Sequence, residues 1–396
     1  MAVIDVDAHF EPARDWLAQF PKLRERLPAF LPDDDPEFAP NTPEHFAYAA
    51  FPLRQTAARE RRIPVSDMTT PFMRAIFPDE RPADFTIGGH SQWQEVDPAA
   101  RVRLLDQQGI AVQNILSGLG MVYMSLIRDT ELGKLAVSSL NTHMAASTSD
   151  HRDRLLPVAM LRYDDLEWSI AELRRMRELG SRAFFVTTEA MGGVPLFHGD
   201  YDRFWSAAED LGMVAILHVG LANAVFDPGY ANTTDPSVLS RIATGQTHQM
   251  GEVFLNAMVF GGVFERHPKL TALICELGVG WVPYTVAGMD SRATAESAVF
   301  LHEYKLPLKP SEYVRRNVRV TPLPNQGQLP FELFERLPGV AVFSSDMPHF
   351  EGNLTPVEFY EKELAGTPAD IRDGFLAGNI AESYARMGDP LVLPTA

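Results

Sequence analysis

The sequence has a single cysteine, Cys275, among its 396 residues. One cysteine cannot form a disulfide within the chain, and such scarcity is typical of a reducing compartment, so we expect a cytoplasmic protein. Basic residues are also few, because 35 Lys and Arg oppose 52 Asp and Glu and leave a net charge of −17. That balance argues against a nucleic-acid partner. No apolar run reaches the length of about 18 residues that spans a membrane, and we expect neither a membrane partner nor a signal peptide.

What the sequence does contain is a regular alternation of short apolar runs and helical periodicity. Eight runs predict strands, at 3–7, 112–117, 155–161, 183–188, 214–219, 270–277, 318–323 and 340–346. Helical patterns lie at 98–108, 130–150, 165–179, 201–211, 237–266, 281–298, 327–336 and 356–387. This alternation is typical of βαβ units and a parallel sheet, so eight units predict an α/β fold, a (β/α)8 TIM barrel formed by one domain over residues 1–396.

The longest interruption of the regular spacing is residues 12–97, a segment rich in Pro, Asp, Phe and Arg. Because it follows the carboxyl end of the first strand, where the active sites of barrels lie, we expect it to cap the site. Its basic cluster could bind an anionic part of a substrate, or could form a solvated helix face. The cluster consists of Arg54, Arg59, Arg61 and Arg62.

Polar residues follow several predicted strands at the end where barrel active sites form. The first strand offers Asp7 and His9 at alternate positions, so both side chains should lie on one face. The fourth, fifth, sixth and eighth strands add Glu189, His218, Glu276 and Asp346. Four carboxylates and two imidazoles in one barrel mouth are costly to bury without cations, so we predict that these six residues bind metal.

The donor types narrow the choice of metal. Carboxylates and imidazoles without a thiolate suit Fe, Mn or Zn. Six ligands exceed what one tetrahedral zinc needs, which leaves room for two ions or for one six-coordinate ion. Cys275 precedes Glu276 and should point to the opposite side of its strand, so it is not counted as a ligand. Glu11 is a further candidate if the first strand continues past His9, whereas Glu189 could instead cap the turn that follows it.

The opening DVDAHFEP, the strand with His218, and the blocks GGVFERHPKLTALICELGVGWVPY and SSDMPHFEG resemble the amidohydrolase-2 family. That family contains metal-dependent barrel hydrolases and decarboxylases. It often begins with His-x-His and has a histidine on the sixth strand, where this chain has Asp7-x-His9 and Glu276. Together the two replacements resemble a branch of the family that contains a nonheme diiron monooxygenase of secondary metabolism.

This resemblance implies our leading hypothesis, a diiron monooxygenase that hydroxylates a bulky apolar substrate, with a coenzyme A thioester as one option. It implies two iron ions, dioxygen and an electron donor as partners, and a homo-oligomer. The ligands carried over are Asp7, His9, His218, Glu276 and Asp346, with Glu189 as a candidate bridge between the ions.

The alternative hypothesis is a Zn- or Mn-dependent hydrolase or non-oxidative decarboxylase of the ordinary family type. A metal would then activate water or hold the substrate, and Asp346 or His349 would move protons. His349 and His248 are the candidate catalytic groups near the substrate, although helix surface is an equally good interpretation of His248. A third hypothesis is a non-catalytic ligand-binding barrel, which has no need for convergent carboxylates.

Overall fold

The computed structural model describes residues 2–12, 16–26, 86–87, 90–91, 97–127, 129–190, 193–220, 245–294, 296–299, 301–349, 351–353 and 355–393. The predicted cap, 12–97, and its arginine cluster therefore lie largely outside the described residues. Within the described residues, no helix is both long enough and apolar enough to cross a membrane.

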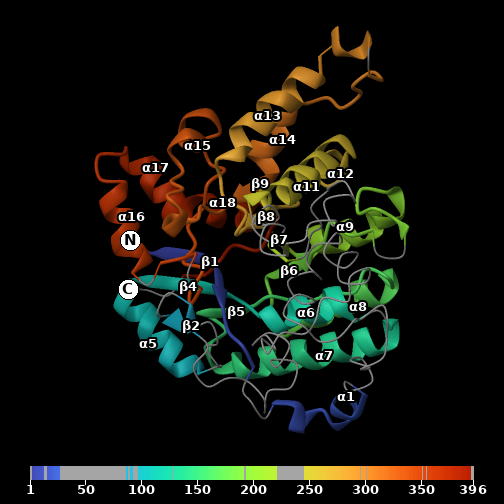
Figure 1. The fold of residues 1–396 in the computed structure, drawn as a ribbon, viewed down its shortest axis with the longest axis vertical. Coiled ribbons are helices and arrows are strands. Elements are labelled where there is room, and N and C mark those ends of the chain that lie inside the picture. Colours follow the sequence, from blue (N-terminus) through green and yellow to red (C-terminus); the bar gives the residue numbers. More distant parts are fainter. Residues whose placement is uncertain are drawn as a thin grey trace, which may run out of the picture.

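Seven parallel strands form two sheets that surround the centre of the molecule (Figure 1). The first sheet contains β1 (Val3–His9), β4 (Ile110–Leu116) and β5 (Leu155–Pro157). The second contains β6 (Ala183–Val186), β7 (Val214–His218), β8 (Ala272–Cys275) and β9 (Val318–Val320). Their order around the centre follows their order in the chain, as a TIM barrel requires.

Three parallel bridges join the sheets and close the barrel. Ala159 pairs with Phe184, Val320 with Ala341, and Ala8 with Met347. The last two bridges place residues 340–347 between β9 and β1, as the eighth member of the barrel. All eight predicted strand positions are occupied in order, so the predicted (β/α)8 fold is confirmed.

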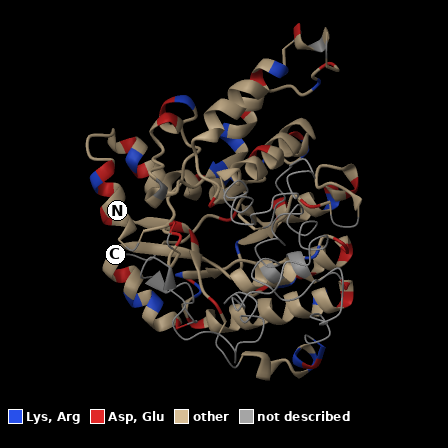
Figure 2. Cartoon of the chain, viewed as in Figure 1, with Lys and Arg blue, Asp and Glu red and all other residues tan. Residues whose placement is uncertain are grey.

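Helices cover the outside of the barrel (Figure 1), and charged residues of both signs are interspersed along them (Figure 2). The α-helices are α1 (Pro21–Arg26), α5 (Pro98–Gln108), α6 (Gly118–Leu126), α7 (Thr130–Ser147), α8 (Leu166–Glu178), α9 (Asp202–Asp210), α11 (His248–Phe260), α12 (Val263–Arg266), α13 (Trp281–Arg292), α14 (Pro310–Asn317), α15 (Phe331–Arg336), α16 (Pro356–Glu363), α17 (Ala369–Asp373) and α18 (Asn379–Arg386). Shorter elements are the hairpin β2 (Thr86–Ile87) and β3 (His90–Ser91), the 3-10 turns η1 (Trp16–Gln19), η5 (Ser149–His151), η7 (Gly199–Tyr201), η9 (Glu296–Val299) and η10 (Pro324–Gln326), and the π-helix η11 (Gly374–Gly378).

The helices that the sequence predicts best begin at aspartate caps. Asp97, Asp129 and Asp165 each accept a hydrogen bond from a backbone N–H in the first turn of α5, α7 and α8. Such a cap satisfies one of the amides that a helix start leaves without a partner. Helices α6 and α14 are not predicted. Their periodic patterns are too short, since α6 has nine residues that include two glycines and α14 has eight that begin with a proline.

One irregularity in β1 has consequences for the site. The register with β4 shifts by one residue between Asp5 and Ala8, which is a β-bulge. Asp5 pairs with Gln113, whereas His9 pairs with Leu116. The bulge therefore turns Asp5 to the opposite side of the strand from Asp7 and His9, towards the layer of helices.

Candidate metal centre

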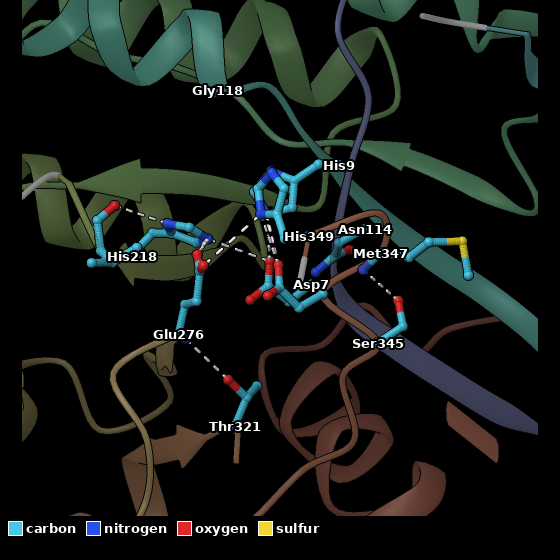
Figure 3. A network of polar contacts seen from close by, with 12 residues as sticks. Asp7, His9, Asn114, Gly118, His218, Glu276, Thr321, Ser345, Met347 and His349 are labelled. Carbon is cyan, nitrogen blue, oxygen red and sulfur yellow. Dashed lines mark hydrogen bonds and ion pairs between the residues drawn. The ribbon is translucent and has the colours of Figure 1, made fainter. Parts of the chain in front are cut away.

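Five of the six predicted metal ligands lie together at the carboxyl ends of the barrel strands. Figure 3 labels four of them, Asp7, His9, His218 and Glu276. Asp7 and His9 come from β1, His218 ends β7, Glu276 follows β8, and Asp346 lies in the eighth strand. All five side chains are buried, with Glu276 the most exposed at 8%. Most of the strand residues before these positions are apolar, with Asp5, Ser344 and Ser345 as buried exceptions.

The polar atoms of these residues lie within a few ångströms of one another. His9 Nε2 is 3.4 Å from both Asp7 Oδ1 and Asp346 Oδ1. His218 Nε2 is 3.5 Å from Asp7 Oδ1 and 2.9 Å from Glu276 Oε2. The other nitrogen of His218, Nδ1, lies 2.9 Å from the carbonyl oxygen of Val219. A proton on Nδ1 would leave the Nε2 lone pair free to bind a cation, which is the usual way a metal-binding histidine is oriented.

These buried atoms lack the partners that buried polar atoms normally have. Within the described part of the chain, Asp7 Oδ1 and Oδ2, His9 Nε2, His218 Nε2, Glu276 Oε2 and Asp346 Oδ2 have no hydrogen bond of good geometry. His218 and Glu276 are close enough for one, but the two groups are not aligned for it. Two sets of donor atoms are compact enough to hold an ion: Asp7, His9 and His218, and His9, Glu276, Asp346 and His349. The residues present therefore fit a divalent cation.

The pKa values show how the centre balances charge through protons alone. Burial opposes ionisation of Asp7, but His218 and His9 outweigh it and hold the pKa of that carboxyl well below its usual range. Burial likewise disfavours the imidazolium of His9, but the carboxylates of Asp346 and Asp7, each 3.4 Å from Nε2, raise its pKa to about 9. Burial also opposes the imidazolium of His218, but the charges of Glu276 and Asp7 raise its pKa well above the usual value. The imidazoles thus carry positive charge that a bound metal ion would otherwise supply.

Two of the carboxylates sit on left-handed backbone. Glu276 has φ 55° and Asp346 has φ 50°, and these are the two non-glycine residues with positive φ in the described chain. Each such conformation costs about 1–3 kcal/mol and persists where the surroundings impose it, most often at functional sites. Here it turns each carboxylate from the end of its strand into the centre.

Cys275 is a correction to the sequence analysis. It pairs in register with His218, and paired residues of adjacent strands project to the same side, so Cys275 faces the barrel interior rather than away from it. Burial and the charge of Asp7 raise the pKa of its thiol well above the usual value. The alternation argument fails because the left-handed backbone at Glu276 breaks the strand period. Cys275 nevertheless belongs to neither compact set of donor atoms.

His349, a predicted catalytic residue, lies beside the centre. Its Nδ1 is 3.0 Å from Asp346 Oδ1 and 3.9 Å from Glu276 Oε1, and its ring stacks 4.0 Å from that of His9. Unlike the five buried residues, its side chain is 18% exposed. The sequence analysis missed Glu351, which lies close enough to the centre to interact with Glu276 and Asp346. Burial, and then the charges of these two residues, raise the pKa of Glu351 to about 8. Its place in the block SSDMPHFEG was the available signal.

The remaining candidates lie elsewhere. Glu189 is partly buried and belongs to neither compact donor set, so the structure does not bring it to the other five. Glu11 accepts hydrogen bonds from Ser117 Oγ and from the backbone N–H groups of Gly118 and Leu119, so its carboxylate caps α6. His248 begins α11 and also lies outside both sets.

His248 instead lines a cavity of about 360 Å³ at the same end of the barrel. Leu277 and Leu323, which follow β8 and β9, form apolar walls together with Trp281, and Gln328 adds an amide. The indole N–H of Trp281 donates to Leu277 O and Gly278 O, so its ring is held in place. The volume falls in the range of small-molecule sites.

The fold is similar to several solved structures. An amidohydrolase from Mycobacterium avium subsp. paratuberculosis K-10 superposes with a TM-score of 0.64 at 21% identity, over 97% of this chain and 99% of that one. A dihydroxybenzoic acid decarboxylase from Polaromonas sp. JS666, with bound manganese and the inhibitor 2-nitroresorcinol, gives 0.58 at 19%, over 97% of both chains. A 5-carboxyvanillate decarboxylase from Novosphingobium aromaticivorans DSM 12444, complexed with manganese and 4-hydroxy-3-methoxy-5-nitrobenzoic acid, gives 0.62 at 15%, over 97% and 96%.

At these identities the likeness shows a shared fold. No curated protein matches the chain. The family model Amidohydro_2, described as amidohydrolase, matches residues 4–386, which is nearly the whole sequence and includes every residue of the centre. The chain therefore belongs to the amidohydrolase family.

Proposed function

We propose that this protein is a Mn²⁺- or Zn²⁺-dependent enzyme that decarboxylates a ring-bearing carboxylic acid without oxidation. The observation that carries the proposal is the set of buried donor atoms without hydrogen-bond partners at Asp7, His9, His218 and Asp346. Carboxylate and imidazole donors suit both metals. The two fold neighbours described with manganese are both decarboxylases, which supports the same chemistry for this chain.

In this reaction the bond to the carboxylate carbon breaks, carbon dioxide leaves, and the ring carbon takes up a proton. A bound cation would supply Lewis acidity that holds and polarises the oxygens of the substrate. His349 would deliver the proton, a role supported by its contact with the buried Asp346 and by its partly exposed side chain. The cavity beside Leu277 would hold the uncharged part of the ring, between the apolar walls and the Gln328 amide.

Hydrolysis is the second candidate, and Glu276 favours it. This carboxylate adds negative charge beside Asp346, so an anionic substrate meets repulsion that a neutral ester or amide does not. Glu276 would then accept the proton of the attacking water. Activity on neutral esters without carbon dioxide release would favour this candidate.

The diiron monooxygenase, our leading hypothesis from the sequence, finds no support in these comparisons, and neither do iron, a coenzyme A substrate or secondary metabolism. Two cations would still balance the carboxylates of the centre, so metal number and identity have to be measured. A homo-oligomer and a dioxygen partner stay predictions.

The deciding experiment is elemental analysis of protein purified without chelator or added metal, followed by assays with 2,6-dihydroxybenzoate. We expect about one Mn or Zn per chain, release of carbon dioxide, and no oxygen consumption, with His218→Ala as the metal-free control. About two irons per chain with oxygen consumption would overturn the proposal in favour of the oxygenase. A chain that binds no divalent metal would overturn metal-dependent catalysis altogether.

A further inference from the structure

Behind the metal centre, three buried side chains form a continuous line of hydrogen bonds from α5 to β1. Arg101 of α5 donates from Nη1 to Gln113 Oε1 at 2.9 Å, and Gln113 Nε2 donates to Asp5 Oδ2 at 2.7 Å. Arg101 is 2% exposed, and the other two are fully buried. Burial of an arginine and an aspartate in a barrel wall costs free energy, whereas apolar side chains would fill the same space without that cost.

Both ends of this line hold the backbone of strands that carry metal-ligand candidates. Arg101 Nη2 donates to the carbonyl oxygen of His9 at 2.9 Å. Asp5 Oδ1 accepts the backbone N–H of Ser345 at 2.9 Å and that of Asp7 at 3.4 Å. Ser345 directly precedes Asp346, whose own N–H donates to Asp7 O at 2.8 Å. The three side chains thus contact β1 and the eighth strand at once.

We propose that Arg101, Gln113 and Asp5 are positioning residues that set the spacing of β1 against the eighth strand, and thereby the metal affinity of Asp7, His9 and Asp346. The inference rests on the proposed function, because it assumes that these residues bind a divalent cation. It assigns no contact with substrate to the three residues. They act through the backbone of the ligands.

The line has a fixed polarity, which makes it testable. Arg101 can only donate, so the Gln113 amide must present its oxygen to Arg101 and its NH2 group to Asp5. Asp5 must then accept on both sides. Replacement of Asp5 by Asn puts one NH2 group against another donor, whichever way the new amide is turned. One buried donor is left without an acceptor, and the two strands are pushed apart.

A second substitution reverses the polarity and restores every bond. In the Asp5→Asn/Gln113→Glu double variant, the introduced carboxylate would accept from Arg101 and from the NH2 group of the introduced amide. The oxygen of that amide would still accept from the backbone of Ser345 and Asp7. The number of buried charges is unchanged. The double variant therefore restores the line of hydrogen bonds and leaves every metal-ligand candidate unchanged.

The experiment measures Mn²⁺ affinity by isothermal titration calorimetry, together with the melting temperature of each metal-free protein. We expect Asp5→Asn to weaken Mn²⁺ binding at least tenfold, and the double variant to return within about threefold of the wild type. Asn141→Ala is the matched control, because Asn141 is fully buried and bonded to Met160 and Glu172, far along the chain from the network. It should lower the melting temperature and leave Mn²⁺ affinity unchanged.

Two results would overturn the inference: wild-type affinity in folded Asp5→Asn, or a double variant as weak as the single one. If Asp5→Asn does not fold, Arg101→Lys takes its place, because a lysine cannot reach both Gln113 Oε1 and His9 O with the same geometry. Wild-type affinity in Arg101→Lys would equally overturn the inference. Failure of the wild type to bind Mn²⁺ or Zn²⁺ would instead overturn the proposed function, and the network proposal with it.

Discussion

Metal binding at neutral pH should release protons from the centre, and the structure indicates how many. The pKa of His9 is about 9 in the metal-free protein, so at pH 7 roughly 100 molecules carry the proton for each one that does not. The charges of Glu276 and Asp7 also raise the pKa of His218 well above its usual value, against burial. A metal ion binds only the neutral imidazole. Binding of Mn²⁺ at pH 7 should therefore release at least about one proton per chain, the proton of His9.

The same reasoning gives the size of the pH dependence. Removal of the proton from His9 at pH 7 costs about 2.7 kcal/mol, since the pKa of His9 lies about two units above that pH and each unit corresponds to ~1.36 kcal/mol. Apparent Mn²⁺ affinity should accordingly rise about 50-fold from pH 7 to pH 9 through His9 alone, with His218 adding to the slope.

Calorimetric titrations in two buffers of different ionisation enthalpy count the released protons directly. His267→Gln is the control, because His267 is also buried but lies near Asp202, outside both compact donor sets. It should leave the count unchanged. Release of no protons, or an affinity that does not change between pH 7 and pH 9, would refute the reasoning, because the imidazoles would then be neutral before metal arrives or would not bind it.

Three further predictions concern stability and metal content. His218→Ala should abolish Mn²⁺ binding, whereas Glu189→Ala should leave the metal-to-protein ratio unchanged; elemental analysis of both variants checks the two placements. The raised pKa of His9 stabilises the metal-free fold fully below the unfolded value near 6.5 and loses this contribution as pH rises through about 9, so the melting temperature of the metal-free protein should fall over that range. Gly278→Ala should cost about 1–2 kcal/mol in urea unfolding, chiefly because Gly278 has φ 69°, and the added Cβ would also displace the Gln328 amide; an unchanged midpoint would contradict this account.

The sequence predicts the barrel and most of the centre for one physical reason. Parallel strands end at a common rim, so polar residues that terminate apolar runs must converge. Asp7, His9, His218, Glu276 and Asp346 all satisfy that rule, and all five meet. The rule does not say how far a chain continues past its strand before a side chain appears. Strand β6 ends at Val186, three residues before Glu189, and Glu189 belongs to neither compact donor set.

Departures from strand periodicity account for what the sequence could not predict. The bulge in β1 turns Asp5 away from Asp7, and left-handed backbone at Glu276, just after β8, brings its side chain to the interior beside that of Cys275. Neither the bulge nor the left-handed backbone can be predicted from the pattern of apolar and polar residues, because each depends on contacts between distant strands. Helix α6 has the same origin: its first turn is held by Glu11, more than 100 residues earlier in the chain.

The centre lies at the seam where the barrel closes, and this couples metal binding to folding. Asp7 and His9 belong to the first strand and Asp346 to the last, and the two strands meet through the Ala8–Met347 bridge. An ion bound to these donors would join residues more than 330 positions apart. The unfolded chain does not present them together, so the free energy of binding adds to the stability of the closed barrel, by about 2.7 kcal/mol when free metal is 100 times the dissociation constant. In the metal-free protein the protonated imidazole of His9 lies 3.4 Å from the carboxylates of Asp7 and Asp346 and also joins the first strand to the last. It stabilises the closed barrel less than a metal ion would, since the imidazole must keep a proton in a buried site.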